Sequence, residues 1–350
     1  MADLYPRTDL YNVPFRTDHF NGMPFRYVGR SGLRAPAIGL GTWKFGYPDT
    51  GDGARVGPRE AHAILDRAVE LGVTFWDTAN RYNGASGNSE RLIGRWLAAN
   101  PDQRRNVIIA TKIGGGMDGV SPNHGGLSRT NIVAGLDACL DRLQLEYVDL
   151  LWFHRPDDDV PVEESLETID DLVRQGRIRY FGVSNFTTEQ LTTYLEVQRT
   201  ISHRCRPVAV QNRFDPLHGE PEGFRGVLEF CHEQDIAFVP YSPLAKGLLT
   251  TRYLDRARPG PGDRLYDEGE LDDPDLDAKL QVVRRLAEVA EASEVEVSQL
   301  AMSYLLALPG MGPQIPSSSS VEQLESNAAS AQITLTQDQI ATITDIFAAT

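Results

Sequence analysis

The sequence predicts an α/β protein, a (β/α)8 barrel of the TIM type. From Leu40 onward, short apolar runs rich in β-branched residues alternate with helical segments, and the alternation stays regular to the end of the chain. Strands that alternate with helices form right-handed parallel crossovers. Eight such units, with no linker that would divide them, favour a closed barrel over an open doubly wound sheet.

The elements are expected in a simple order. Residues 1–22 are predicted to be an irregular N-terminal extension, and residues 23–350 a single barrel domain. Residues 23–28 and 33–38 flank the turn Arg30-Ser31-Gly32 and predict a β-hairpin that caps the bottom of the barrel. Parallel strands are expected at residues 39–43, 73–77, 106–112, 147–154, 178–183, 207–212, 236–241 and 312–316.

Helices are expected at residues 58–71, 89–99, 128–143, 162–175, 187–199, 222–234, 276–292, 298–308, 321–329 and 336–347. Pro58 suits a first helical turn, and Ser128 is a good N-cap. The one segment that breaks the rhythm, residues 246–275, is rich in Pro, Gly and charge. Long connections of this kind tend to be lids or binding loops.

Composition excludes several classes of protein. The chain has 350 residues, a net charge of −15 and a hydrophobic fraction of 41%. The acidic balance disfavours nucleic acid and anionic membranes as partners, and no apolar run approaches the length of a membrane-spanning helix. The N-terminus lacks the apolar core of a secretory signal, and three scattered cysteines fit a reducing compartment. We therefore expect a cytoplasmic protein that acts on a small molecule; the sequence does not predict an oligomeric state.

Polar side chains stand at the C-terminal ends of the predicted strands, which meet on one face of a barrel. Lys112 is the clearest, because it closes the apolar run Val107–Thr111, where an unpaired ammonium is costly to bury. Asp77, at the end of the neighbouring strand, is the expected partner. The residues at the strand ends are Trp43, Asp77, Lys112, His154, Ser184, Asn185, Gln211, Tyr241, Ser242 and Ser317.

Asp77, Tyr82, Lys112 and His154 together indicate a proton-transfer site. A phenol is a weak acid at neutral pH, and a nearby ammonium favours its ionised form, so we expect Lys112 to lower the pKa of Tyr82. Asp77 would hold Lys112 charged, and His154 would hydrogen-bond a substrate oxygen. Taken singly, each residue has an ordinary alternative: a structural ion pair, a core histidine or a surface aromatic.

These residues resemble the Asp, Tyr, Lys, His tetrad of the aldo-keto reductases. The segment Trp76-Asp77-Thr78-Ala79-Asn80-Arg81-Tyr82 carries the first two members. The motifs at residues 25–33, 125–129 and 142–149 resemble the branch that contains potassium-channel β subunits and bacterial glyceraldehyde-phosphate-reductase-like enzymes. The resemblance runs from about Met23 to the C-terminus.

The resemblance implies a nicotinamide cofactor, NADPH in preference to NADH, bound without a Rossmann motif. It also implies interconversion of a small-molecule aldehyde or ketone with its alcohol, with Tyr82 as the general acid. The implied cofactor-binding residues are Gly41, Thr42, Trp43, Asp77, Ser184, Asn185, Gln211, Tyr241, Ser242, Pro243, Leu244, Gly247, Arg252, Arg264, Ser317, Ser319, Gln323 and Asn327.

Two departures from the family pattern concern specificity. Gln323 stands where classical members carry an arginine for the 2′-phosphate, and Asn83 replaces the glycine that usually follows the catalytic tyrosine. Trp43, Tyr47 and Asn83 are the expected substrate residues. Lys44 or Arg155 could favour a phosphorylated or acidic aldehyde, and each could equally be a solvated surface charge. We expect Phe153 and Trp76, although they are next to tetrad residues, to pack between barrel and helices.

Two other functions compete with carbonyl reduction. The channel-subunit resemblance allows a regulatory protein that binds NADPH as a redox sensor with little turnover, although channel β subunits carry asparagine where His154 stands. A third hypothesis is a metal-dependent barrel hydrolase or isomerase, but the predicted strand ends lack the clustered His, Asp and Glu that would bind a metal.

Overall fold

The computed structural model describes residues 17–47, 55–255 and 259–348. Most of the expected N-terminal extension, residues 1–16, lies outside the described residues. Of the remainder, His19–Phe20 forms a short strand, β1, which pairs with β2.

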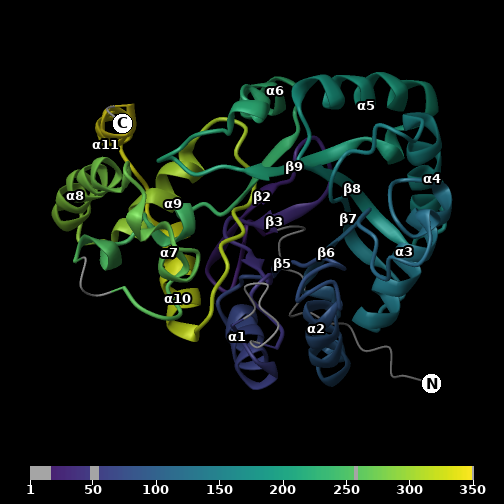
Figure 1. Ribbon diagram of the computed structural model, residues 1–350, viewed down its shortest axis with the longest axis horizontal. Coiled ribbons are helices and arrows are strands. Elements are labelled where there is room, and N and C mark those ends of the chain that lie inside the picture. Colours follow the sequence, from purple (N-terminus) through teal and green to yellow (C-terminus); the bar gives the residue numbers. More distant parts are fainter. Residues whose placement is uncertain (1–16, 48–54, 256–258, 349–350) are drawn as a thin grey trace, which may run out of the picture.

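Seven parallel strands form the central sheet, in the order β10-β9-β8-β7-β6-β5-β4 (Figure 1). Their order along the chain is also their order in space, as expected for repeated strand–helix units. The strands are β4 (Leu40–Gly41), β5 (Phe75–Asp77), β6 (Ile108–Ile113), β7 (Val148–Phe153), β8 (Ile178–Ser184), β9 (Pro207–Arg213) and β10 (Ala237–Tyr241).

The eighth strand position is filled by an irregular segment, residues 311–317. Met311 bridges to Phe238 beside β10, while Gln314 and Ser317 bridge to Ile38 and Gly41 beside β4, all in parallel. Prolines 313 and 316 have no N–H to donate, so the segment cannot form a continuous ladder. The barrel is nevertheless brought close to closure, which confirms the predicted (β/α)8 fold.

Helices cover the outside of the sheet (Figure 1). α1 shows why they form: Ala61, Ile64, Leu65 and Ala68 are buried at intervals of three or four residues, which is one face of a helix. The helices are α1 (Pro58–Glu70), α2 (Asn88–Ala99), α3 (Arg129–Leu143), α4 (Val162–Arg174), α5 (Thr188–Ile201), α6 (Val227–Glu233), α7 (Arg264–Asp267), α8 (Leu276–Ala292), α9 (Val297–Ala307), α10 (Val321–Ala329) and α11 (Gln337–Ala348).

Helix α6 begins five residues later than the sequence predicted. Residues 222–224 form a separate 3-10 turn, and Gly226 then adopts a left-handed conformation with φ 83°. The Glu220 carboxylate accepts hydrogen bonds from the backbone N–H groups of Gly226 and Leu228, at 2.8 and 2.7 Å. This acidic cap sets the true start of the helix.

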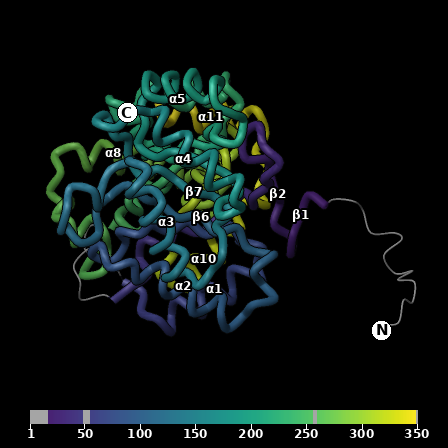
Figure 2. Tube along the Cα trace, turned by 90° about the vertical axis from the view of Figure 1, so that its right-hand side faces the viewer, coloured from purple at the N-terminus to yellow at the C-terminus, as the bar shows by residue number. Residues whose placement is uncertain are grey.

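The hairpin of β2 (Met23–Tyr27) and β3 (Arg34–Pro36) lies at the N-terminal ends of the barrel strands. Val28 and Leu33 are buried in one cluster with Val208 and Ala237. These two residues lie at the N-terminal ends of β9 and β10. The Arg30 N–H donates to the Asp235 carbonyl at 2.7 Å. The hairpin therefore covers the bottom of the barrel; in the side view of Figure 2, β1 and β2 lie at one edge of the molecule.

The main core lies between the sheet and its helices. Trp76 is fully buried there and meets Trp96 of α2 edge-on, with ring centroids 5.0 Å apart. Phe153 packs the same way on Phe181, at 4.7 Å. Both Trp76 and Phe153 are thus core residues rather than parts of a substrate pocket.

Candidate active site

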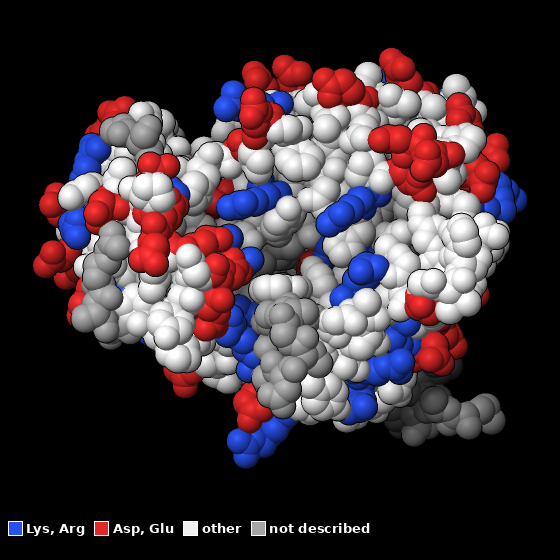
Figure 3. All heavy atoms as spheres, viewed as in Figure 1, with Lys and Arg blue, Asp and Glu red and all other residues white. Residues whose placement is uncertain are grey.

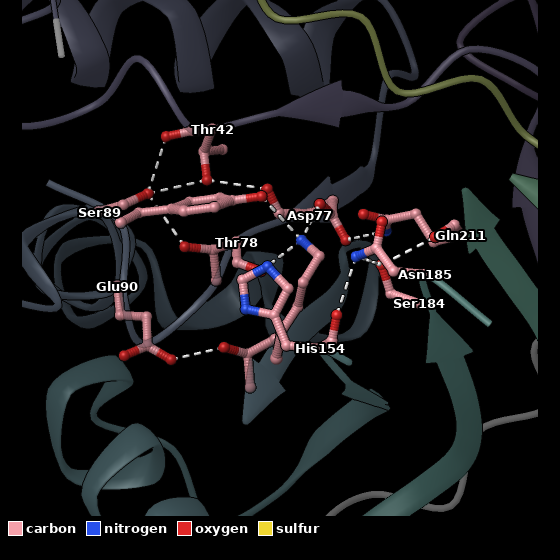
Figure 4. A network of polar contacts seen from close by, with 12 residues as sticks. Thr42, Asp77, Thr78, Ser89, Glu90, His154, Ser184, Asn185 and Gln211 are labelled. Atoms are coloured by element: carbon pink, nitrogen blue, oxygen red, sulfur yellow. Dashed lines mark hydrogen bonds and ion pairs between the residues drawn. The ribbon is translucent and has the colours of Figure 1, made fainter. Parts of the chain in front are cut away.

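The four expected catalytic residues come together at the C-terminal end of the barrel, where Figure 4 labels Asp77 and His154. Asp77 ends β5, Lys112 lies near the end of β6, His154 directly follows β7, and Tyr82 lies on the loop after β5. The Lys112 ammonium donates to Asp77 Oδ2, to the Tyr82 hydroxyl at 2.9 Å and to the Thr78 carbonyl at 2.9 Å. All three hydrogens of the ammonium therefore have an acceptor.

Asp77 and Lys112 form a buried ion pair, with side chains only 2% and 1% exposed. The second carboxylate oxygen of Asp77 accepts a hydrogen bond from Gln211 Nε2 at 2.8 Å. Burial alone would lower the pKa of Lys112, but attraction by Asp77 and Tyr82 outweighs it, so the pKa is raised and the ammonium stays charged.

The acidity of Tyr82 differs from the sequence-based expectation. Burial raises the pKa of the phenol, and the opposing attraction of Lys112 does not overcome it. Our prediction that Lys112 would bring the pKa below its usual value is therefore wrong, because the sequence showed the cation and not the depth of burial. Tyr82 is therefore a neutral phenol beside a cation.

His154 is held neutral. Burial, followed by the charges of Lys112, Arg155 and Arg81, lowers the pKa of its imidazole to about 3. Its ring stands edge-on to that of Tyr82, with centroids 6.3 Å apart. A neutral imidazole at this place can donate one hydrogen bond to an oxygen shared with Tyr82.

A network of buried hydroxyl groups lies next to the ion pair and supports Asp77. Thr42 Oγ1 donates to the Asp77 carbonyl at 2.9 Å, and the Ser89 hydroxyl contacts both the Thr42 and Thr78 hydroxyls, at 2.8 and 3.0 Å (Figure 4). Thr42 is fully buried and does not line the cleft described next. Thr42 therefore has a structural role, which is to support Asp77.

A cleft of about 620 Å³ opens from the catalytic residues across the barrel end. It is bordered by Asp77, Tyr82 and His154 at one end and by α10 at the other. Of the residues expected to bind a cofactor, Thr42 is the one that does not line it. Those that do are Gly41, Trp43, Asp77, Ser184, Asn185, Gln211, Tyr241, Ser242, Pro243, Leu244, Gly247, Arg252, Arg264, Ser317, Ser319, Gln323 and Asn327.

Asn185 and Tyr241 are fixed relative to the catalytic centre. Asn185 Nδ2 donates to the His154 carbonyl at 2.9 Å, and its Oδ1 accepts from the Tyr241 hydroxyl at 2.9 Å. Asn185 and Ser242 both adopt left-handed backbone conformations, with φ of 62° and 61°. Non-glycine residues held this way cluster at binding sites, where the surrounding structure sustains the strain.

Cationic groups gather in the cleft, and their arrangement fits a polyanionic cofactor. Lys44, Arg55 and Arg264 lie close enough that, after burial, the two arginines help to lower the pKa of Lys44 to about 8. Arg264 also stands over the Trp43 ring, 4.9 Å from its centroid. An anion in the cleft would relieve this repulsion, as the phosphates of a nicotinamide dinucleotide would.

The polar side chains at the far end of the cleft, where the resemblance implies the adenosine of a cofactor, are hydrogen-bonded to one another. Gln323 Oε1 accepts from both the N–H and the hydroxyl of Ser319, at 2.9 and 3.0 Å. Asn327 Nδ2 donates to the Ser318 hydroxyl at 3.1 Å. These contacts order the turn that leads into the N-terminus of α10, a place where backbone N–H groups favour anions.

Two of the three expected substrate residues lie away from the cleft wall. Asn83 is 1% exposed, and its amide bonds both the N–H and the carbonyl of Tyr47, at 3.1 and 3.2 Å. Tyr47 is 46% exposed. Asn83 therefore ties the loop after β4 to the loop after β5, and any effect on substrate choice would pass through that loop.

Sequence reasoning missed several charged residues of the cleft. Arg55, Lys246, Asp263, Glu296 and Glu322 line it. Four cations among the described residues of the cleft are engaged by acidic partners. Arg252 donates to Asp263 at 2.7 Å and Lys246 to Glu268 at 2.7 Å. Arg55 pairs with Asp267 at 2.5 Å and Arg264 with Glu268 at 2.6 Å. The basic charge of residues 246–264 was visible in the sequence, but which cations were already paired was not.

The described residues contain neither a metal-ligand group nor a membrane-spanning helix. Across residues 17–47, 55–255 and 259–348, no three His, Cys, Asp or Glu side chains are grouped so as to hold a metal ion. In the same ranges no helix combines the length and the apolar character that crossing a bilayer requires.

The (β/α)8 barrel carries a buried Asp–Lys–Tyr cluster and a neutral histidine beside a cleft of about 620 Å³, an arrangement that suits an oxidoreductase. The chain belongs to the aldo/keto reductase family, whose sequence profile matches residues 37–348.

Named relatives fall in the expected branch. An L-glyceraldehyde 3-phosphate reductase of Escherichia coli O157:H7 is 32% identical, covering 93% of both chains. The protein of the same name from strain K12 is 33% identical, over 89% of this chain and 88% of its own. A putative voltage-gated potassium channel subunit beta of Schizosaccharomyces pombe is 32% identical over 89% of each.

Proposed function

We propose that this protein is an NADPH-dependent reductase that converts an aldehyde or ketone to its alcohol, or runs the reverse reaction. The observation that carries the proposal is the Tyr82 hydroxyl, which accepts a hydrogen bond from Lys112 while keeping its own proton. This is the state required of an acid that protonates a carbonyl oxygen.

Each residue of the cluster has a separate part. A nicotinamide cofactor, when bound, supplies the hydride. Tyr82 donates its proton to the carbonyl oxygen as negative charge develops there, and the Lys112 ammonium stabilises the phenolate that remains. Asp77 keeps Lys112 charged and in position, and neutral His154 donates a hydrogen bond to the same oxygen.

The cleft residues support the cofactor assignment. Asn185 and Gln211 present amide groups beside the catalytic centre, and Tyr241 offers an aromatic ring next to them. Lys44, Arg55 and Arg264 provide positive charge for the phosphates, and Gln323 with Ser319 provides polar groups at the adenosine end. Because of this positive charge, we propose NADPH as the cofactor in preference to NADH. We also propose that the protein acts in the cytoplasm.

The test is oxidation of NADPH, followed at 340 nm, with a panel of aldehydes that includes phosphorylated and uncharged members. Turnover with at least one aldehyde, and weaker binding of NADH than of NADPH, is the expected result. Arg264→Ala should weaken NADPH binding more than NADH binding if Arg264 contacts the 2′-phosphate.

A second function is favoured by one observation, the similarity to a putative channel subunit. In that case the protein would bind NADPH and report redox state with little turnover. Tight NADPH binding with no oxidation across the whole panel would favour this regulator over the reductase.

A further inference from the structure

His154 borders a second cavity besides the cofactor cleft. This cavity has a volume of about 790 Å³ and lies over the loops that follow β6 and β7. Because His154 lines both spaces, a carbonyl placed between Tyr82 and His154 can direct its substituents into the second cavity. The residues lining it are Arg81, Gly114, Gly115, Pro122, Asn123, Gly125, Gly126, Leu127, Ser128, His154, Arg155, Pro156, Asp157, Asp159 and Val160.

Two arginines of this cavity stand next to catalytic residues in the chain. Arg81 precedes Tyr82, and Arg155 follows His154. The Arg81 guanidinium donates to the Gly116 carbonyl, and a side chain on Gly115 would collide with it. Within the described part of the chain, the Arg155 guanidinium has neither an ion pair nor a hydrogen bond, so its charge is available to a ligand.

The cavity also contains two acidic residues, Asp157 and Asp159, which across the described ranges do not contact the arginines as ion-pair partners. Asp157 is occupied by backbone groups, accepting from the N–H of Leu127 at 2.7 Å and from that of Asp159 at 3.1 Å. No ion pair joins Asp157 or Asp159 to either arginine among the residues that the structure describes. The positive charge also reaches the catalytic centre, because Arg155 and Arg81 both contribute to lowering the pKa of His154.

The two arginines stand in a protein whose net charge is −15. On the face shown in Figure 3, several Lys and Arg side chains lie around a central hollow, acidic side chains border its left side, and many other Asp and Glu side chains lie toward the periphery. A cation without an acidic partner among the described residues, such as Arg155, can attract a small anion even in an acidic protein.

We propose that the cavity holds the anionic end of the substrate, with Arg155 and Arg81 as the specificity residues for an aldehyde that carries a phosphate or carboxylate. The inference rests on the proposed reductase function and gives its substrate class. Arginine suits the role because its planar guanidinium forms paired hydrogen bonds with both kinds of anion. The position of Arg155 beside His154 requires the anionic group to lie only a few bonds from the carbonyl.

The test compares matched charged and uncharged aldehydes with NADPH as reductant. The pairs are glyceraldehyde 3-phosphate with glyceraldehyde, and succinic semialdehyde with butyraldehyde; the quantity compared is the charged-to-uncharged ratio of kcat/KM. Hydrogen bonds to charged groups predict that R155Q and R81Q each lower this ratio roughly tenfold or more. The pair with the larger ratio in the wild type tells whether phosphate or carboxylate is preferred.

Arg59 provides the matched control, because its side chain is 93% exposed on α1, paired with Glu60 and away from both cavities. R59Q should leave both ratios as in the wild type, and R155K should fall between wild type and R155Q. Added salt should lower the ratio in the wild type more than in R155Q. Thermal melting of each variant shows whether it is folded.

Two outcomes separate the inference from the proposed function. If the wild type reduces the uncharged aldehydes but shows no preference for the charged ones, or if R155Q and R81Q keep the wild-type ratio, this inference is overturned and the reductase stands. If the wild type reduces none of the four aldehydes, both are overturned.

Discussion

The buried ion pair of Lys112 and Asp77 leads to a prediction about the free energy of unfolding. Lys112→Met removes the cation but leaves Asp77 buried, with Gln211 as its remaining side-chain partner. Removing one member of a buried ion pair costs about 3–5 kcal/mol, because the other charge is left without compensation. Asp77→Asn combined with Lys112→Met removes both charges, so the double variant should be more stable than K112M although it lacks two native side chains.

The size of the effect on melting follows from the length of the chain. An unfolding entropy of about 2.1 cal/mol/K per residue gives roughly 0.7 kcal/mol/K for this protein, so each kcal/mol shifts the midpoint by about 1.4 °C. K112M should therefore melt about 4–7 °C below the wild type, and the double variant should regain a good part of that loss.

The pH dependence gives an independent check on the same variant. Burial already raises the pKa of Asp77, and loss of Lys112 raises it further. A carboxyl whose pKa is higher in the folded state stabilises below its unfolded pKa of about 4, and that stability is lost as the pH rises through the folded pKa. The deficit of K112M should be larger at pH 8 than at pH 5.

The assay is thermal unfolding followed by circular dichroism at the two pH values, with NADPH oxidation measured alongside. The reasoning is refuted if K112M melts with the wild type, or if the double variant is less stable than K112M at pH 8. Neither variant should recover turnover, because both lack the ammonium beside Tyr82.

Two further predictions concern pH. Because the pKa of His154 is lowered to about 3, kcat/KM should show no limb near pH 6.5; a limb there that disappears in His154→Gln would contradict the neutral assignment. Because of the same shift, the free energy of unfolding should decrease as the pH falls from about 6.5 toward 3. In that range His154 binds a proton in the unfolded chain but not in the folded protein. Lys44 has a pKa of about 8, so NADPH binding should weaken between pH 7 and 9 as its ammonium loses its proton. Fluorescence titration of Lys44→Met should show a smaller change of NADPH affinity with pH. The same change of affinity with pH in the two proteins would show that Lys44 is not part of the phosphate site.

The barrel could be predicted from the sequence because its signals are local. Each strand is an apolar run of a few residues, and each helix repeats its apolar positions every three or four residues. The start of α6 could not be placed, because it depends on Glu220 reaching forward to the N–H groups of Gly226 and Leu228. The eighth strand was located correctly, but its prolines reduce it to isolated bridges.

The catalytic cluster was predictable for a different reason. A lysine at the end of a buried strand needs a counter-charge, and the parallel order of the strands leaves Asp77 as its neighbour. The sign of the pKa shift on Tyr82 was not predictable, because it is the difference between burial and the attraction of Lys112. The hydrogen bond from Gln211 to Asp77 was also missed, since it joins residues 134 positions apart.

The role of Asn83 shows what a departure from a family pattern can and cannot indicate. The replacement of glycine by asparagine drew attention to this loop, and we expected a substrate contact. The structure gives the side chain a scaffold role, with hydrogen bonds to Tyr47 and from Asn88. Its positive φ of 60° explains why asparagine can occupy a glycine position.

The central claim is that Tyr82 is the acid of a carbonyl reduction, and Tyr82→Phe tests it most directly. The variant removes one hydroxyl, which accepts from Lys112 and faces the cleft. The prediction is that fluorescence titration gives an unchanged affinity for NADPH, while single-turnover oxidation of NADPH by an aldehyde slows by about 10²–10⁴-fold, as expected for loss of a general acid. Reduction at the wild-type rate in Tyr82→Phe would contradict the assignment.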